Sequence, residues 1–194
     1  MIKRIFDLLF SIIALIIFSP FFIIIAIIIK LHDLGPVFYM APRVGQYGKL
    51  FNMFKFRTMV MNADKIGASS TTLSDSRITT IGHFLRKYKL DELPQLINVF
   101  IGNMSIVGPR PHPGPLNMQS KDKVKMYMLR HLVKPGITGW AQVNGHRGET
   151  ASIEKMQKRI EHDIWYIENW SFWLDIQIIF MTVWNMIKGD PNAY

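Results

Sequence analysis

The strongest pattern in this chain is an apolar run near the N-terminus. Residues 12–29 read IIALIIFSPFFIIIAIII, and only Ser19 and Pro20 interrupt the run. Eighteen such residues are enough for a helix to cross a bilayer, but a proline inside a helix removes a backbone donor and bends it. Basic residues flank the run on both sides, which indicates that both ends lie at one membrane face. Two topologies stay open: a kinked span, and a re-entrant hairpin over residues 1–30 that breaks at Ser19-Pro20.

After this run the pattern becomes that of a mixed domain. Residues 50–56 alternate in part between apolar and polar side chains, and the glycines before them predict a β-hairpin closed around residues 46–48. Residues 78–90 predict a short amphipathic helix. Residues 91–102, DELPQLINVFIG, predict a second helix with Asp91 near its N-cap.

The remaining segments favour helices over strands. Residues 104–115 hold four prolines and two glycines, which predicts irregular backbone, whereas residues 120–133 and 150–169 look like amphipathic helices. Residues 170–187 carry three tryptophans on an almost wholly apolar helix, which is typical of a core helix or of one at the membrane interface. We therefore predict a helix-rich α+β fold, with a small domain at residues 31–194 that ends in a membrane-interface helix.

Charge narrows the class of partner. The chain has a formal net charge of +9 and contains no cysteine. The lack of cysteine excludes a disulfide scaffold and a thiolate zinc site. Nine Lys/Arg residues against two Asp lie in residues 42–89, which indicates an anionic partner: nucleic acid, lipid headgroups or a phosphorylated small molecule. Neither a Rossmann nor a P-loop phosphate motif is present.

The basic stretch leads directly to two adjacent carboxylates, Asp91 and Glu92. Adjacent helical residues point about 100° apart, so the two carboxylates cannot face each other across the bond to be cleaved, as they do in glycosidases. At a helix N-terminus, however, one carboxylate can attack a phosphorus atom while its neighbour holds a divalent cation. The alternative is purely structural, with Asp91 as an N-cap and Glu92 as an ordinary first-turn residue.

Three motifs, DELPQ, GPRP and PGITGWAQVNG, occur in this order and add a family resemblance. SDSRITTIGHFLRKYKLDELPQLINVFIGNMSIVGPRPHPGP, followed by KPGITGWAQVNGHRGET, resembles the bacterial monotopic polyprenyl-phosphate phosphoglycosyl transferases, or bacterial sugar transferases, over nearly the whole chain. It looks most like the branch that includes undecaprenyl-phosphate glucose and galactose phosphotransferases. The resemblance implies transfer of a sugar-1-phosphate from a UDP-sugar to undecaprenyl phosphate with release of UMP, supported by Mg²⁺. It also implies a place among membrane lipids at the cytoplasmic face of the bacterial inner membrane, in exopolysaccharide, capsule or O-antigen assembly.

The resemblance carries over to particular residues. Asp91 matches the family nucleophile, Glu92 its metal-associated partner, and Ser19-Pro20 the membrane break, which favours the re-entrant topology. Phosphate-binding candidates are Arg86, Arg110, Lys55 and Arg57. Candidates for the nucleotide or sugar pocket are Gln142, Asn144 and Arg147, with His112 and His146 as weaker ones. Asp163 is either a second metal ligand or an ion-pair partner of Arg159.

Two other classes of function stay open at this point. A nucleic-acid-binding protein would use the basic stretch, but it would need neither the apolar run nor the acid pair, so we expect no nucleic acid. A non-catalytic protein of the membrane surface would bind lipid through both apolar ends, and residues 91–95 would have no role in its function. The sequence leaves the sugar open, and it also leaves open whether the protein forms a homodimer.

Overall fold

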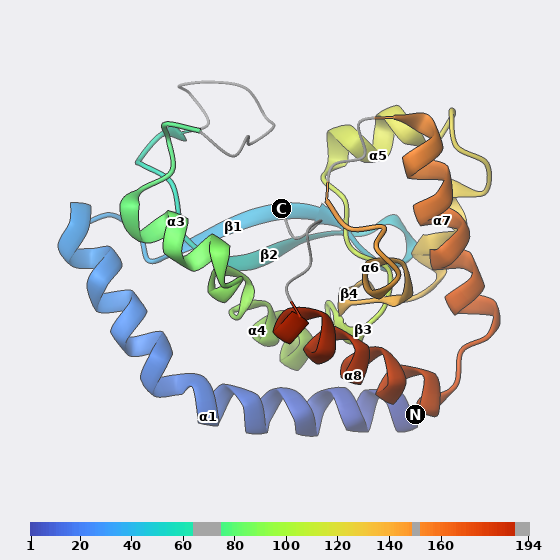
Figure 1. Ribbon diagram of the computed structural model, residues 1–194, viewed down its shortest axis with the longest axis horizontal. Helices are drawn as coiled ribbons and strands as arrows, with labels where there is room; N and C mark the ends of the chain where they lie inside the picture. The colour runs from blue at the N-terminus through green and yellow to red at the C-terminus, as the bar shows by residue number, and fades with distance from the viewer. Residues whose placement is uncertain (64–74, 149–151, 189–194) are drawn as a thin grey trace.

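A computed structural model describes residues 1–63, 75–148 and 152–188. The fold is α+β and rich in helix, as predicted (Figure 1). The elements are α1 (Ile2–Asp33), β1 (Phe38–Val44), η1 (Gln46–Gly48), β2 (Leu50–Phe56), α3 (Thr80–Lys87), η2 (Leu90–Glu92), α4 (Gln95–Ile101), β3 (Ser105–Val107), α5 (Gly114–Ser120), η3 (Tyr127–Leu132), β4 (Gly136–Thr138), α6 (Trp140–Val143), α7 (Ile153–Glu168) and α8 (Phe172–Lys188).

The N-terminal apolar run forms one helix, α1, that bends near its middle and stays helical through Pro20 (Figure 1). The expected interruption of the helix at Ser19-Pro20 is therefore wrong, although the bend is present. Pro20 has no N–H to donate to the carbonyl of Ile16, four residues earlier. The hydroxyl of Ser19 donates to that carbonyl instead, at 2.8 Å. This replacement bond explains how the helix continues past the proline.

One face of α1 packs against the rest of the protein. Its buried side chains follow helical spacing and are Asp7, Ser11, Ala14, Ile25 and Ile29. The helix is long and apolar enough to cross a membrane, yet only 17% of its most apolar window is buried. A core helix of this composition would be mostly covered, so α1 presents a long apolar face to its surroundings.

The first turns of α1 are bonded to the domain. The buried Asp7 carboxylate accepts from the Ser105 hydroxyl at 3.0 Å and from the Ile106 N–H at 2.9 Å. Lys3 forms an ion pair with the buried Asp175 of α8 at 2.5 Å. The basic flank and the one acidic residue of this segment therefore fasten α1 to β3 and α8.

The last turn of α1 is bonded to the same domain. Both guanidinium NH₂ groups of Arg57, just after β2, donate to the carboxylate of Asp33. Ile29 is buried in one cluster with Phe56 and Leu85. The two ends of α1, on either side of its bend, thus contact one globular unit.

The predicted hairpin is confirmed. β1 and β2 pair antiparallel, with Val44 opposite Leu50, around the η1 turn. The side chain of the buried Asn98 in α4 makes two hydrogen bonds to the unpaired edge of β2. Its Oδ1 accepts from Phe54 N at 2.8 Å, and its Nδ2 donates to Asn52 O at 2.8 Å. α4 is thereby held against the strand that carries Lys55.

We predict that Asn98→Ala destabilises the protein by about 2–3 kcal/mol, because it leaves the Phe54 N–H and the Asn52 carbonyl without partners. Thermal unfolding followed by circular dichroism measures the loss. Asn103→Ala, at an exposed position just beyond α4, is the control and should leave the melting temperature unchanged. Equal melting temperatures for both variants would contradict this role of Asn98.

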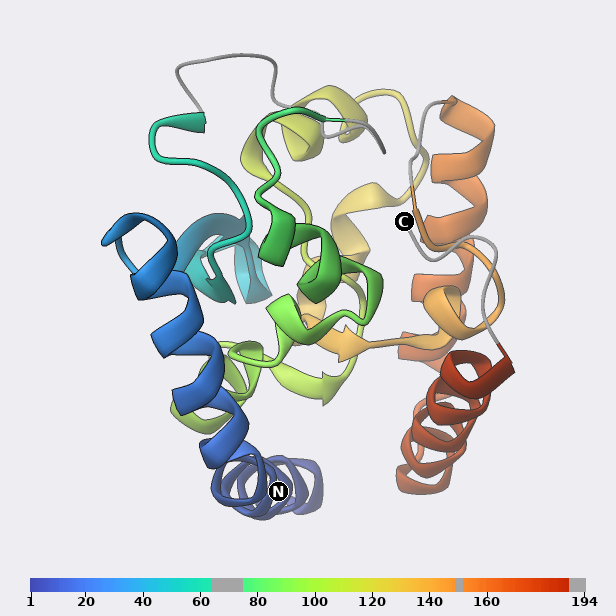
Figure 2. The ribbon, with the colours of Figure 1, turned by 60° about the vertical axis from the view of Figure 1, so that its left-hand side comes forward.

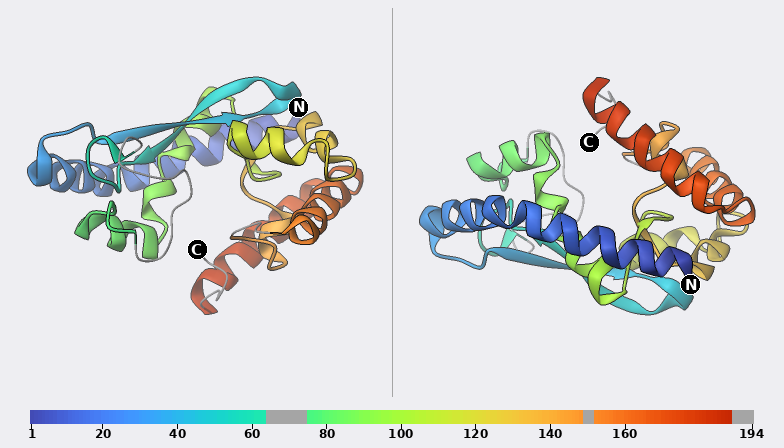
Figure 3. Two further views of the ribbon diagram at one scale, coloured as in Figure 1. Left: turned by 90° about the horizontal axis from the view of Figure 1, so that it is seen from above. Right: turned by 90° about the horizontal axis from the view of Figure 1, so that it is seen from below.

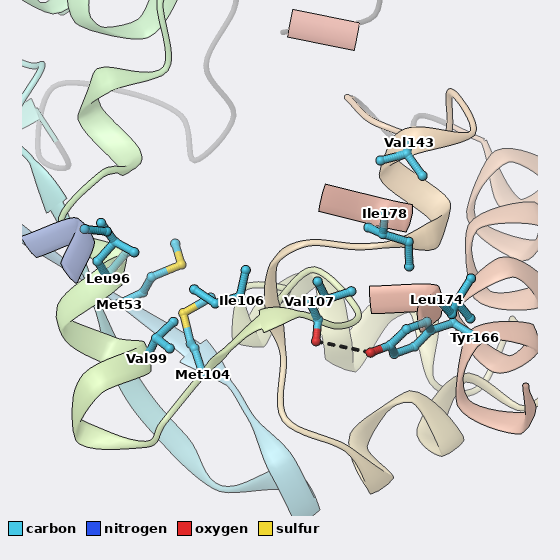
Figure 4. Packing of buried hydrophobic residues seen from close by; sticks show 12 residues of the cluster. Met53, Leu96, Val99, Met104, Ile106, Val107, Val143, Tyr166, Leu174 and Ile178 are labelled. Atoms are coloured by element: carbon cyan, nitrogen blue, oxygen red, sulfur yellow. Dashed lines mark hydrogen bonds between the residues drawn. The ribbon is translucent and has the colours of Figure 1, made fainter. Parts of the chain in front are cut away.

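β3 and β4 form a short parallel pair, where irregular backbone was expected over residues 104–115. The pair brings the GPRP and KPGITG motifs side by side: Gly108 N donates to Thr138 O, and Gly136 N donates to Pro109 O, each at 2.9 Å. A Cβ on Gly136 would lie 2.1 Å from Gly108 N, so only glycine permits this approach. The main core gathers side chains from α4, β3, α7 and α8 (Figure 4).

α8 is in part a core helix and in part exposed. Leu174 and Ile178 are buried in the main core, whereas Trp173 is 77% and Trp184 66% exposed. The two long apolar helices lie on the same side of the domain and converge at their N-terminal ends (Figures 2 and 3), where the rings of Phe6 and Phe172 meet edge to face at 5.4 Å. Both helices carry exposed apolar side chains, and the helices themselves lie on one side of the molecule.

Candidate active site

The acid pair lies in η2, a turn of 3₁₀ helix before α4, and not at the N-cap of α4. α4 begins at Gln95 with Pro94 as its N-cap residue. The predicted support from a helix N-terminus is therefore wrong for Asp91. The electrostatic environment of the pair must come from neighbouring side chains.

Glu92 is bound by two cations. Lys55 Nζ lies 2.7 Å from Glu92 Oε1, and Arg110 reaches Oε1 at 2.5 Å and Oε2 at 3.2 Å. Burial opposes ionisation of Glu92, but the charges and hydrogen bonds of Arg110 and Lys55 outweigh it and hold the pKa of Glu92 well below its usual value. Glu92 is thus an anion that fixes Lys55 of β2 beside Arg110 of the proline-rich loop, which is residues 108–113 between β3 and α5.

Asp91 has a different environment. Its side chain is buried, and it takes part in no hydrogen bond or ion pair among the described residues. Burial raises the pKa of Asp91 to about 6, with Lys55 opposing the rise and the charge of Glu92 adding to it. A desolvated carboxylate without hydrogen bonds is a better nucleophile than a solvated one and attracts a further cation.

Arg86 approaches the pair from α3. Its Nε donates to the hydroxyl of Thr58 at 2.9 Å, and its charge acts on both Asp91 and Glu92. Burial lowers the pKa of Arg86, but the arginine stays charged. The structure therefore brings three of the four phosphate-binding candidates, Arg86, Arg110 and Lys55, together around the acid pair.

A pocket of about 260 Å³ opens beside these residues. Four cationic side chains line it, and they come from four separate parts of the chain: Arg43 of β1, Lys55 of β2, Arg110 of the proline-rich loop and Arg159 of α7. The other residues that line it are Met53, Pro111, His112, Pro113, Leu116 and Gly148. Four cations around one small pocket make a site for an anion with several charges.

The proline-rich wall of this pocket is held by Arg130 of η3. One NH₂ group of Arg130 donates to the carbonyl of Arg110 at 2.6 Å, and the other lies 2.6 Å from Nδ1 of His112. The buried carboxylate of Asp163 pairs with Arg130 at 2.8 Å. Asp163 is therefore an ion-pair partner, of Arg130 and not of Arg159 as anticipated, and the structure does not bring it to Glu92 as a second metal ligand.

Several other predicted residues lie elsewhere. Arg57 is bound to Asp33 and fastens α1. Gln142 is buried and donates to Ile137 O at 3.3 Å, while its Oε1 has no partner among the described residues. Asn144 is exposed and donates to the carbonyl of Trp140 in its own turn. These three side chains thus have structural contacts and do not line the pocket.

Arg147 is partly exposed, next to the pocket residue Gly148. His146 is likewise outside the pocket and lies against the ring of His162, with centroids 4.2 Å apart. The sequence reasoning missed Arg43 and Arg159 as pocket residues. The sequence analysis counted Arg43 among nine basic residues, and nothing in the sequence distinguished it from the others. No local motif marks Arg159, because only tertiary contacts bring it to the pocket.

Mg²⁺ fits the residues present, although no group of three or more His, Asp or Glu in the described ranges could hold a metal alone. Proteins usually bind Mg²⁺ through one or two carboxylates together with substrate phosphates and water. The carboxylate of Asp91 has no hydrogen-bond or ion-pair partner among the described residues, so its oxygens can act as ligands beside Glu92. A divalent ion that arrives with a diphosphate would find a ligand there.

Comparison with known proteins matches residues 1–189 to a family described as bacterial sugar transferase. The chain is 50% identical over 193 residues to the UDP-glucose:undecaprenyl-phosphate glucose-1-phosphate transferase of Escherichia coli K12, which covers 99% of this chain and 41% of that protein. It is 42% identical over 188 residues to the UDP-N-acetylgalactosamine-undecaprenyl-phosphate N-acetylgalactosaminephosphotransferase of Aeromonas hydrophila, with 97% and 44% covered.

A shorter relative matches over most of its own length. The exopolysaccharide production protein PSS of Rhizobium leguminosarum bv. phaseoli is 42% identical over 186 residues, which cover 94% of this chain and 93% of that protein. The chain therefore spans about two fifths of the first two relatives and nearly all of this one. Because the match extends over almost the whole chain, the chain belongs to the bacterial sugar transferase family.

Proposed function

We propose that this protein transfers a sugar-1-phosphate, most simply a hexose-1-phosphate, from a UDP-sugar to undecaprenyl phosphate and releases UMP. The observation that carries the proposal is the four-cation pocket, two of whose residues, Lys55 and Arg110, also bind Glu92 beside the unpartnered Asp91. The names of the relatives supply the substrate class. Such a transfer would be the first membrane step in assembling an exopolysaccharide, a capsule or an O-antigen.

The chemistry runs in two displacements at one phosphorus atom. A carboxylate oxygen of Asp91 attacks the phosphorus that carries the sugar, and the bond from that phosphorus to the bridging oxygen breaks. UMP leaves with the bridging oxygen and its electron pair. A phosphate oxygen of undecaprenyl phosphate then attacks the same phosphorus, and the bond to Asp91 breaks, which restores the carboxylate. A water-soluble and a lipid substrate therefore need not occupy the site together.

The surrounding cations offset the repulsion between the carboxylate and the phosphates. Arg110 and Lys55 are fixed by Glu92, and Arg86 by Thr58, so they hold their positions before substrate arrives. Glu92, with Asp91 beside it, would hold Mg²⁺. When bound, the ion would neutralise charge on the phosphate oxygens.

We further propose a re-entrant topology at the cytoplasmic face of the bacterial inner membrane. Asp7 and Asp33, near the two ends of α1, bind the same domain through Ser105 and Arg57. A straight span would separate these contacts by the ~30 Å hydrocarbon core. Both ends therefore stay on one side, and the exposed apolar faces of α1 and α8 enter the lipid together.

Single cysteines test this topology, because the chain has none of its own. We predict that Ile2→Cys and Leu34→Cys, both at exposed positions, are protected from an impermeant thiol reagent in intact cells. Both should react in inverted vesicles, as should a reference cysteine at the exposed Lys121 of the domain. Labelling of one end but not the other in intact cells would show a spanning helix.

The donor panel tests the function itself. With undecaprenyl phosphate and Mg²⁺, we predict UMP release from UDP-glucose or UDP-galactose at a kcat/KM about tenfold or more above that of their N-acetylated counterparts. The reasons are the resemblance to the hexose branch and the 50% identity to a relative named for glucose. Faster release from N-acetylated donors contradicts the sugar assignment, and no release from any donor contradicts the proposed function.

A further inference from the structure

His112 has a fixed tautomer. Its ring is buried, with Nδ1 2.6 Å from an NH₂ group of Arg130 and 2.7 Å from the hydroxyl of Tyr127. Arginine donates hydrogen bonds and cannot accept them, so Nδ1 must be the acceptor and carries no proton. Burial, together with the charges of Arg130, Arg159 and Arg110, holds the pKa of His112 well below its usual value. The neutral ring therefore carries its proton on Nε2.

The Nε2–H group faces another donor. Nε2 lies 3.5 Å from NH1 of Arg159, and both residues line the cationic pocket. The other guanidinium nitrogens of Arg159 are used, since Nε donates to His146 O at 2.9 Å and NH2 donates to Gly148 O at 2.7 Å. Two N–H donors that face each other at this distance do not satisfy each other. They leave a place for one acceptor oxygen that both can bind.

We propose that His112 Nε2–H and Arg159 NH1 bind an oxygen of the phosphate that leaves with UMP. This inference rests on the proposed function. It states which residues of the pocket bind each of the two phosphates of the donor. Lys55 and Arg110, which bind Glu92 next to the nucleophile, mark the end that receives the sugar-bearing phosphate. His112 of the proline-rich loop and Arg159 of α7 line the same pocket, within reach of the second phosphate. Arg130 and Asp163 act as positioning residues, because they orient His112 without lining the pocket.

Two substitutions separate the two nitrogens of the ring. His112→Asn retains an acceptor near the position of Nδ1 for Arg130 and removes the pocket-facing donor. His112→Gln places an amide N–H near the position of Nε2. By calorimetry on the full chain in detergent, we expect UMP to bind His112→Asn at least about tenfold more weakly than wild type, and His112→Gln within about threefold of wild type.

Uridine and the lipid substrate identify the group that is bound. Uridine lacks the phosphate, so its affinity should be the same in wild type and His112→Asn. The kcat/KM for undecaprenyl phosphate should not change, because this ratio reports only the second displacement. Equal weakening of UMP and uridine would overturn the proposal in favour of a nucleoside contact. A lowered kcat/KM for undecaprenyl phosphate with unchanged UMP affinity would overturn it in favour of the acceptor phosphate. Failure of wild type to bind UMP would also overturn it.

Nitrogen-15 NMR of the unmodified protein gives a test that does not depend on a variant that folds. We expect an unprotonated Nδ1 and a protonated Nε2 for His112, with an Nε2–H resonance that shifts on addition of UMP but not of uridine. A proton on Nδ1, or no shift with UMP, overturns the proposal. Labelling of Asp91 by UDP-sugar is measured separately by intact mass, so failure of this subsite is distinguishable from failure of the proposed function.

Discussion

Asp91→Asn should abolish both the covalent intermediate and turnover. Incubation of wild type with UDP-sugar and Mg²⁺ alone should increase the intact mass by one hexose phosphate less water, with release of UMP. The variant should show no mass increase, and its kcat should fall at least about 10⁴-fold, because an amide in place of the buried carboxylate cannot attack phosphorus. Mass spectrometry and a UMP-release assay measure the two effects.

Glu92→Gln is the matched control, since it also removes one charge from the acid pair but leaves the nucleophile in place. It should still form the intermediate, at a reduced rate, because Lys55 and Arg110 lose their anchoring anion. Initial rates with one substrate varied at several levels of the other should give parallel lines. Converging lines, together with no adduct on wild type, would indicate direct transfer in a ternary complex and would contradict the role of Asp91.

Arg110→Lys should lower kcat/KM by about 100-fold, although the charge is retained. Arg110 binds both oxygens of Glu92, at 2.5 and 3.2 Å, and lines the pocket at the same time. The planar guanidinium can face a carboxylate and a phosphate together, whereas a lysine ammonium is a single point charge. Steady-state UMP release over a range of UDP-sugar concentrations measures the loss.

Arg57→Lys provides the comparison for this prediction. Arg57 is also a basic residue that forms a bidentate bond, but its partner is Asp33 at the end of α1 and it does not line the pocket. Its substitution should lower the melting temperature slightly and leave kcat/KM within about twofold of wild type, as expected for a partly exposed ion pair. Wild-type turnover in Arg110→Lys, or an equal loss in both variants, would contradict the role of Arg110.

The local elements of this fold were determined by sequence pattern. The hairpin around residues 46–48, the amphipathic helices α3 and α7, and the end of α4 at Gly102 follow from spacing and turn residues. The DELPQ and GPRP motifs likewise pointed to Asp91 and Arg110. Such features depend on contacts between near neighbours in the chain, so sequence order is enough to reveal them.

Predictions of backbone conformation from the sequence were wrong where a tertiary or side-chain contact stabilised a different conformation. The helix α1 continues through Pro20 because the hydroxyl of Ser19 serves the carbonyl that the proline cannot. Residues 105–107 form a strand because Gly136 allows β4 to come close. Propensity alone predicts a break and an irregular loop at these places, since it does not include the partner that satisfies the backbone.

Membership of the pocket was decided only by the tertiary structure. Arg43 and Arg159 are separated by more than a hundred residues, and no spacing rule connects them. Strand alternation would place Arg57 on the same face as Lys55, two residues earlier. Arg57 lies beyond the end of β2, however, and pairs with Asp33 instead. The sequence by itself marked Asp91, Glu92 and Arg110 as candidate site residues, whereas the folding of four distant segments onto one another decided which cations meet at the pocket. The physical reason is that the interaction between charges depends on their separation in space. The order of residues along the chain does not specify that separation.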